Sequence, residues 1–224
     1  MKKILCVVTS NNVKGATGIP TGFWLSELTH SLEKFVAAGF EFELASIKGG
    51  KPPIDGDSLD FSDAVNKKFW DDKNFQRKLE NSLRLDDVTA ADFDAIFCAG
   101  GHGVMWDFAD SAAIDKVTRE IYERGGIVSA VCHGPAALVN VKLSDGKFLV
   151  DGKNLTAFTN GEEEAVQATD IVPFLLETAL KNHGAIHHAA ANWSNHVVED
   201  GRLVTGQNPA SAAGVGAAVV KLLS

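Results

Sequence analysis

Cysteine is scarce in this sequence, and no apolar stretch runs for long. The three cysteines, Cys6, Cys98 and Cys132, share no C-x-x-C spacing, which disfavours a disulfide framework and favours reduced thiols in a cytoplasmic protein. The apolar run at residues 4–8 is too short for the core of a signal peptide, and no later segment is long enough to span a membrane.

Basic residues are outnumbered by acidic ones. With 21 Lys and Arg against 29 Asp and Glu, the formal net charge is -8, which argues against nucleic acid or an acidic membrane surface as a partner. The chain also lacks internal repeats and a low-complexity linker. Its 224 residues, 45% of them hydrophobic, can bury one sizeable core, so we expect a single domain over residues 1–224.

Predicted strands and helices alternate along the chain. Continuous apolar and β-branched runs are typical of strands that are covered on both faces. They occupy residues 3–9, 40–47, 94–99 and 127–130. Apolar residues at helical spacing lie between them, at residues 24–36 and 110–124. This order predicts an α/β fold with a doubly wound, mostly parallel sheet sandwiched by helices.

One long segment interrupts this alternation. Residues 48–60 are predicted to form a loop, and residues 63–83 carry a broken helical pattern around Phe69 and Phe75. This insertion, at about residues 49–88, is either a lid or dimer contact, or a surface excursion packed by its own aromatic residues. The sequence leaves both interpretations open.

The final third of the chain predicts two hairpins and three helices. A glycine-containing turn predicts a hairpin over residues 147–158, and a second turn predicts another over residues 197–205. Helices are expected from Ala165 onward, at residues 172–180 and at residues 212–223.

Cys132 stands between the predicted strand at residues 127–130 and a helical turn expected at residues 135–139. A strand that turns directly into a helix presents the junction side chain at the edge of the sheet, as in a nucleophile elbow. Ala130 and Gly134 are small enough for such a turn. The helix N-terminus would then make Cys132 an activated, accessible thiolate. The alternative is a cysteine that is simply a small buried apolar residue.

A glycine-rich loop, GGHG at residues 100–103, follows the strand at residues 94–99. Glycines allow the backbone to approach a ligand closely, and their NH groups can stabilise a developing negative charge. Phosphate binding is another use of such a loop, but neither G-x-G-x-x-G nor G-K-[ST] occurs in it. We therefore expect an oxyanion site at Gly100 and Gly101, with the NH groups of Gly101 and His133 as donors.

Three consecutive glutamates, Glu162 to Glu164, precede the helix expected from Ala165. Their negative charge suits a helix N-terminus. Alternatively, one of them orients His133, because a catalytic base needs a third group to fix its tautomer. The sequence favours neither interpretation.

Four motifs, spread over most of the chain, together resemble one known family. They are AGGHG at residues 99–103, AVCHGP at 130–135, FTN at 158–160 and VTGQNPAS at 204–211. Jointly they are similar to the ThiJ/PfpI superfamily. The insertion and the glycine-rich entry to the first helix are similar to its branch of heat-shock chaperones that also act as glutathione-independent glyoxalases, the glyoxalase III type. The resemblance implies a flavodoxin-like sandwich of the class I glutamine amidotransferase type, a homodimer, and neither a metal nor an organic cofactor.

The resemblance also assigns roles to individual residues. The family's nucleophile falls on Cys132, the histidine beside it on His133, and a protonated glutamate under the sulfur on Glu27. The third member of the catalytic triad falls on Glu163, although the neighbouring Glu162 leaves the register open.

His30 lies three residues after Glu27, on the same face of the predicted helix. It either lines the substrate pocket or makes a structural contact. Ser31 occupies a position where the family commonly has proline, so the local structure is expected to differ there.

The implied activity is that of a cysteine-dependent lyase or hydrolase. A small 2-oxoaldehyde such as methylglyoxal would become a 2-hydroxy acid, D-lactate, with Cys132 attacking the aldehyde and His133 or Glu27 moving a proton. Repair of glycated proteins is an overlapping activity. Two other classes stay open: a stress holdase that binds misfolded proteins through exposed aromatic residues of the insertion, and a cysteine amidase or peptidase.

Overall fold

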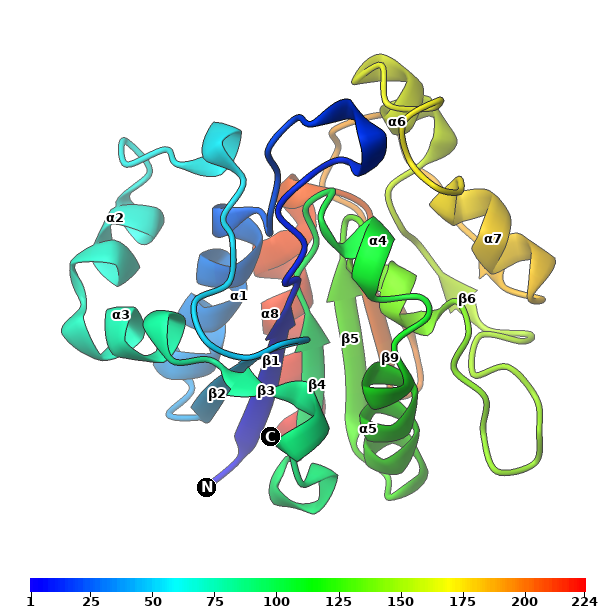
Figure 1. Ribbon diagram of the computed structural model, residues 1–224. Coiled ribbons are helices and arrows are strands. Elements are labelled where there is room, and N and C mark those ends of the chain that lie inside the picture. The colour runs from blue at the N-terminus through cyan, green and yellow to red at the C-terminus, as the bar shows by residue number, and fades with distance from the viewer.

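A seven-stranded sheet forms the centre of the computed structural model (Figure 1), which describes all residues from Met1 to Ser224. Its strands are β1 (Lys3–Val8), β2 (Glu41–Ser46), β3 (Leu83–Arg84), β4 (Ala95–Cys98), β5 (Ile127–Val131), β8 (Val197–Asp200) and β9 (Leu203–Gly206). Their order is β3-β2-β1-β4-β5-β9-β8, in which only β8 runs antiparallel to its neighbour. Two short strands, β6 (Asn154–Leu155) and β7 (Ile186–His187), pair separately.

Helices cover both faces of this sheet. They are α1 (Leu25–Ala37), α2 (Ala64–Asp71), α3 (Lys73–Glu80), α4 (Val104–Asp107), α5 (Ala112–Glu123), α6 (Asn160–Ala165), α7 (Leu176–Asn182) and α8 (Ala212–Leu223). α1 and α8 pack against each other on one face, whereas α4 and α5 lie on the opposite face (Figure 1). None of these helices combines the length and the apolar character needed to cross a lipid bilayer.

The central strands are buried on both faces, which explains their continuous apolar sequences. In β1, Ile4, Cys6 and Val8 pack into the core on the side of α1 and α8, whereas Leu5 and Val7 pack on the side of α5. Burial of one such aliphatic side chain contributes about 1.5–3 kcal/mol to folding. The expected doubly wound, flavodoxin-like α/β fold is confirmed.

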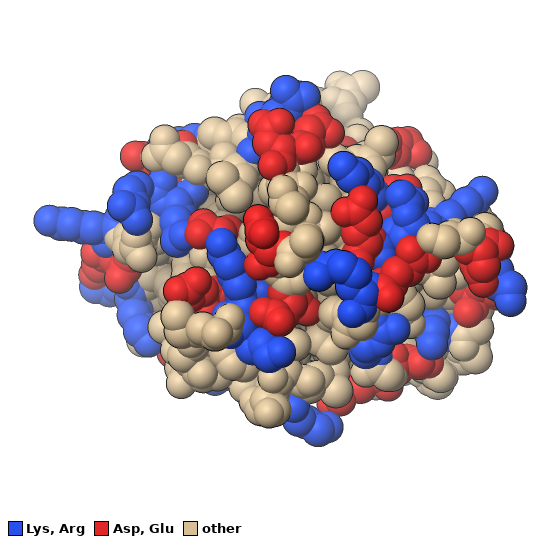
Figure 2. Space-filling model, turned by 90° about the horizontal axis from the view of Figure 1, so that it is seen from below, with Lys and Arg blue, Asp and Glu red and all other residues tan.

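The parallel register brings the carboxyl ends of β1, β4 and β5 to one edge of the sheet. Cys6 pairs with Phe97, and Phe97 pairs with Ser129, so the loops that follow these strands meet at the top of Figure 1. Both termini lie toward the opposite end. Figure 2 shows that end, where Lys and Arg side chains alternate with Asp and Glu without a continuous field of one sign.

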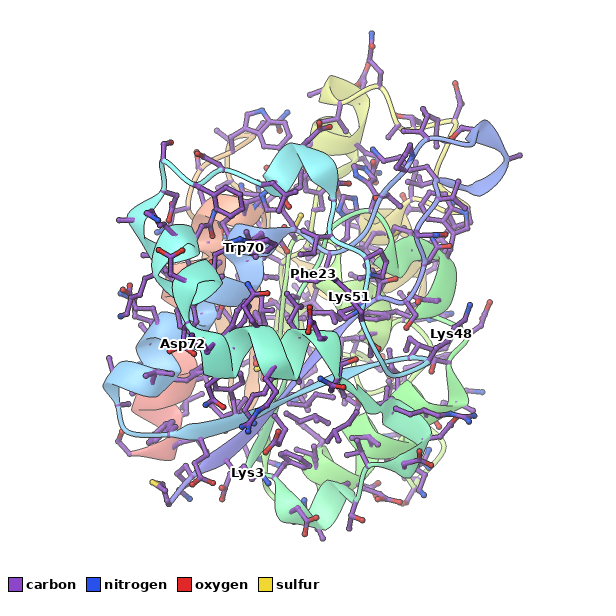
Figure 3. The ribbon with its side chains drawn as sticks, turned by 60° about the vertical axis from the view of Figure 1, so that its left-hand side comes forward. Lys3, Phe23, Lys48, Lys51, Trp70 and Asp72 are labelled. Carbon is purple, nitrogen blue, oxygen red and sulfur yellow. The ribbon has the colours of Figure 1, made fainter.

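The insertion folds into two short helices and an edge strand, β3. α2 and α3 meet at Asp72 (Figure 3), whose carboxylate accepts hydrogen bonds at 2.8 Å from the NH groups of Asn74 and Phe75. Phe69 and Phe75 are buried in the core beside α1, with ring centroids 5.4 Å apart. The prediction of an exposed aromatic surface for a holdase is therefore wrong at these two residues, because they pack the insertion onto the core.

One predicted hairpin is wrong, whereas β8 and β9 form the other as expected. In place of a hairpin over residues 147–158, an earlier turn at Gly146 pairs Lys142 with Phe148. The residues after Gly152 form β6, which pairs with β7 in parallel. The error arises because both glycines adopt positive φ and can form a turn, and the earlier one forms the hairpin.

The helix predicted from Ala165 onward in fact ends at that residue. Thr159 and Glu162 form a capping box at the start of α6, so the three glutamates lie inside the helix. The next helix, α7, begins after Pro173 rather than before it, because proline disfavours helical backbone in the residue that precedes it.

Candidate functional site

Cys132 follows β5 at the carboxyl edge of the sheet, in the expected sharp turn. Its φ is 60°, a left-handed conformation that is uncommon outside glycine and marks strain. Two backbone hydrogen bonds hold the turn: the NH of Cys132 donates to Gly206 at 2.9 Å, and its carbonyl accepts from Phe158 at 2.8 Å. A Cβ at Gly134 would collide with the carbonyl oxygen of Cys98, so this position requires glycine.

The segment after the elbow differs from the prediction. It is a five-residue 3-10 helix, Gly134–Leu138, which aligns few peptide dipoles toward the sulfur. Burial raises the pKa of Cys132 well above its usual value, and the carboxyl group of Glu27 raises it further. With 3% of its surface exposed, Cys132 is a buried thiol at neutral pH, not the accessible thiolate expected from the sequence.

His133 reaches the thiol of the residue that precedes it. Its Nδ1 atom lies 3.5 Å from Cys132 Sγ, and its Nε2 atom lies 2.8 Å from Glu163 Oε2. Burial lowers the pKa of His133 to about 4, repulsion from His102 adds to the effect, and Glu163 opposes it. A neutral imidazole that donates from Nε2 to Glu163 leaves Nδ1 free to accept the thiol proton.

Glu163 contacts two histidines, and sequence reasoning missed the second. Its Oε1 atom lies 2.8 Å from His102 Nε2, and the His102 and His133 ring centroids are 4.3 Å apart. Burial alone would raise the pKa of Glu163, but the two histidines outweigh it and lower this pKa to about 2. Glu163 is therefore a carboxylate at neutral pH. The signal for His102 was a histidine in a glycine-rich loop at the carboxyl end of a buried strand.

Glu27 projects from the first turn of α1 into the interior beside the thiol. Its side chain is fully buried, and its Oε2 atom accepts a hydrogen bond from the NH of Gly100 at 2.7 Å. Burial raises the pKa of Glu27 to about 8, and its contacts with Cys132 and Gly100 offset only part of this rise. At neutral pH the carboxyl group is mostly protonated, so it can donate a hydrogen bond to sulfur.

Gly100 and Gly101 differ in what their NH groups do. The NH of Gly100 is taken by Glu27 and cannot bind a substrate oxygen, which corrects the prediction for this residue. The NH of Gly101 has no acceptor within the protein, and the NH of His133 lies at the sulfur of Cys132. Gly100 is needed for a steric reason, because a Cβ there would lie 2.7 Å from Glu27 Oε2 and from His133 N.

Glu162 points away from the histidines. Its buried carboxylate accepts hydrogen bonds of 2.8–3.2 Å from groups of Thr159, Trp193, Gln207 and Asn208. Successive residues of a helix point roughly 100° apart, so α6 directs its two buried carboxylates to different partners. Of the two candidates, Glu163 is the one in contact with His133.

His30 does not join this group. Its Nε2 atom lies 2.9 Å from Asp63 Oδ2, and Asp63 caps α2, so the contact links α1 to the insertion. The structure shows the structural contact, and His30 also lines a surface pocket together with Trp24 and Asp63, so its part in substrate binding stays a prediction. Ser31 is buried and donates to the carbonyl of Ala212 at 2.9 Å, which links α1 to α8.

His102, His133 and Glu163 are the residues that could hold a metal ion, since their ligand atoms lie within 4.8 Å of one another. Glu163 already contacts each of the two histidines at 2.8 Å. A zinc ion, with ligands about 2.0–2.1 Å away, would replace these hydrogen bonds and the protons in them.

Known proteins resemble this chain over nearly its whole length. Glyoxalase 3 of Candida albicans is 34% identical over 222 residues, which cover 95% of this chain and 94% of that protein. The glutathione-independent glyoxalase HSP31 of Saccharomyces cerevisiae is 34% identical over 228 residues, which cover 94% and 93%.

Solved structures and a family comparison agree with these relatives. The Rapid Encystment Protein 24 kDa of Francisella tularensis superposes with a TM-score of 0.97 at 42% identity, over 100% of both chains. Glyoxalase III from Candida albicans superposes with a TM-score of 0.92 at 32% identity, over 99% of this chain and 97% of that one. Residues 18–222 match the DJ-1/PfpI family. As the motifs predicted, the chain belongs to the DJ-1/PfpI (ThiJ/PfpI) family.

Proposed function

We propose that this protein is a glutathione-independent glyoxalase that converts 2-oxoaldehydes such as methylglyoxal into 2-hydroxy acids through Cys132. The observation that carries the proposal is the line of contacts from the thiol through His133 to Glu163, with a protonated carboxyl group beside the sulfur. The names of the relatives support it, because Glyoxalase 3 and the glyoxalase HSP31 align with nearly the whole chain.

In the first step, Cys132 attacks the aldehyde carbon. His133 Nδ1 takes the thiol proton as the carbon–sulfur bond forms, because a buried thiol needs a base at the moment of attack. Glu163 stabilises the resulting imidazolium and keeps its orientation. The new oxyanion receives hydrogen bonds from the NH groups of Gly101 and His133, then takes the proton from His133 to give a hemithioacetal.

In the second step, the hemithioacetal isomerises. His133, neutral again, removes the proton from the former aldehyde carbon, and the electron pair moves onto the oxygen of the neighbouring ketone to form an enediolate. The hydroxyl proton then shifts from the former aldehyde oxygen to the former ketone oxygen. Return of a proton to the former ketone carbon gives a thioester of lactic acid. Water then cleaves the thioester and restores the thiol. Because one carbon is oxidised while its neighbour is reduced, the reaction needs no external oxidant or reductant.

Substrate class separates this proposal from an amidase or peptidase that uses the same two residues. Cys132 and His133 are both nearly inaccessible to solvent, which favours a small substrate over a peptide. The test is to incubate the purified protein with methylglyoxal in the absence of glutathione and, in parallel, with fluorogenic peptides. Methylglyoxal should be consumed and the peptides left intact. Cleavage of the peptides with methylglyoxal unchanged would overturn the proposal in favour of a peptidase.

The same proposal includes a cytoplasmic homodimer, one domain in each chain, and glycated proteins as further substrates. Light scattering during size-exclusion chromatography should give twice the chain mass of 23.8 kDa. A mass equal to one chain at micromolar concentration would contradict the dimer and leave the chemistry of the site unaffected.

A further inference from the structure

A half-exposed tryptophan lies beside the proposed catalytic residues, and no step above uses it. Trp193 has 48% of its surface exposed, and its ring centroid lies 5.7 Å from that of Phe158. Phe158 is itself buried and packs on the ring of His133, at 4.2 Å between centroids. The indole is thus the solvent-facing end of an aromatic row that begins at His133.

The backbone of Trp193 is held in a conformation that its side chain disfavours. Its φ is 65°, in the left-handed region that bulky residues rarely adopt. The NH of Trp193 donates to Glu162 Oε1 at 2.8 Å, and the same oxygen accepts from Gln207 at 3.1 Å and from Asn208 at 2.9 Å. A buried carboxylate therefore fixes the turn.

Glycine or asparagine would fit this turn with less strain. A large, exposed apolar side chain at such a position gains little from burial, so packing alone does not explain it. Backbone strain that the surrounding structure enforces is typical of functional positions. The indole is 48% exposed and lies at the solvent-facing end of the aromatic row that leads to His133.

We propose that Trp193 is a specificity-determining residue, whose indole forms the outer wall of the substrate site and contacts the substituent on the ketone carbon of the 2-oxoaldehyde. The inference rests on the proposed glyoxalase function. A phenyl substituent is longer than a methyl group and is planar, so it is the better matched to a neighbouring aromatic ring. Aromatic rings attract each other at centroid separations of roughly 4.5–7 Å, the range in which Phe158 and Trp193 already lie.

Aromatic 2-oxoaldehydes should therefore be better substrates than methylglyoxal. A contact with a remote, non-reacting substituent is present in the ground state and in the transition state alike, so its main effect is on KM rather than on kcat. The probes are phenylglyoxal and methylglyoxal, which share the reacting carbons and differ in that substituent.

Two variants test the contribution of the indole ring to substrate preference. Trp193→Gly removes it and accepts the positive φ, so the turn loses strain rather than gaining it. Trp193→Phe keeps an aromatic ring. The ratio of kcat/KM for phenylglyoxal to that for methylglyoxal should fall roughly threefold to tenfold in Trp193→Gly, through KM. The ratio should stay within about twofold of the wild type in Trp193→Phe. An unchanged ratio in Trp193→Gly, or an equal fall in both variants, would overturn the inference.

A second measurement needs no turnover. Phenacyl bromide and bromoacetone carry the same two substituents, and each alkylates a thiol by displacement of bromide. Their relative rates at Cys132 are measured by mass spectrometry, with Cys132→Ser as the background control. The wild type should prefer the phenyl reagent, and Trp193→Gly should lose that preference. An equal preference in both proteins overturns the role of Trp193. Absence of 2-oxoaldehyde turnover in the wild type refutes the proposed function instead, and the alkylation ratio still decides the role of Trp193.

Discussion

Replacement of Glu27 by glutamine tests whether the buried carboxyl group of Glu27 is protonated at neutral pH. Burial raises the pKa of Glu27 from 4.5 to about 8. Between these pH values the folded protein holds a proton that the unfolded chain has released. The stability linked to this proton is present in full below pH 4.5 and is lost as the pH rises toward 8, at about 1.4 kcal/mol per pH unit.

Glutamine has nearly the shape of a protonated glutamic acid and does not titrate. Its oxygen can still accept the hydrogen bond from the NH of Gly100. The assay is urea-induced unfolding of the wild type and Glu27→Gln at several pH values between 5 and 8. From pH 5 to pH 7, the free energy of unfolding of the variant should rise relative to the wild type by about 3 kcal/mol. A difference that stays constant over this range would refute a buried, protonated Glu27.

The same variant separates the two candidate proton carriers. With the oxygen of the amide held by Gly100, its NH2 group can replace the carboxyl proton as a donor to sulfur. If His133 moves the proton, Glu27→Gln should retain kcat for methylglyoxal within about tenfold. A loss of about 10²-fold or more, the usual contribution of a general acid or base, would assign proton transfer to Glu27.

Three further outcomes follow from the contacts of the site. His102→Gln keeps an amide donor for Glu163 but removes the repulsion from His102, which adds to burial in lowering the pKa of His133. The acid limb of the kcat/KM profile should therefore move to higher pH, and an unmoved limb would contradict this electrostatic role of His102. Gly100→Ala places a Cβ 2.7 Å from the carboxyl group of Glu27 and should cost about 1–3 kcal/mol in urea unfolding; wild-type stability would show that the site can relax. Glu162→Ala leaves several buried donors unpaired and should destabilise the fold by at least about 2 kcal/mol, which a thermal melt that matches the wild type would disprove.

The sheet and most of its helices could be predicted because their signals are local. The apolar runs that become β1, β4 and β5 are covered on both faces and are buried along almost their whole length. The hairpin at residues 147–158 was wrong because Gly146 and Gly152 both permit a turn, and the choice between them depends on which segment pairs with β7. That pairing is tertiary and leaves no local signal.

From the residues alone, the site was predictable only where neighbouring residues in the sequence specify the local structure. Cys132 lies in an elbow that its neighbours specify, whereas Glu27 would look like an exposed helical carboxylate without the family resemblance. Glu162 and Glu163 could not be told apart, because a shift of one residue on a helix changes the partner completely. His102 was not predicted as a site residue because its role depends on the contact with Glu163, which is 61 residues away in the chain.

The central claim, that Cys132 carries out glutathione-independent isomerisation of a 2-oxoaldehyde, is tested most directly by measuring D-lactate formed from methylglyoxal without glutathione. Wild type and Cys132→Ser are purified and assayed side by side. The wild type should form D-lactate continuously, and Cys132→Ser should lose at least about 10³-fold in rate, since it lacks the nucleophile. No D-lactate from the wild type, or equal formation by Cys132→Ser, would contradict the claim.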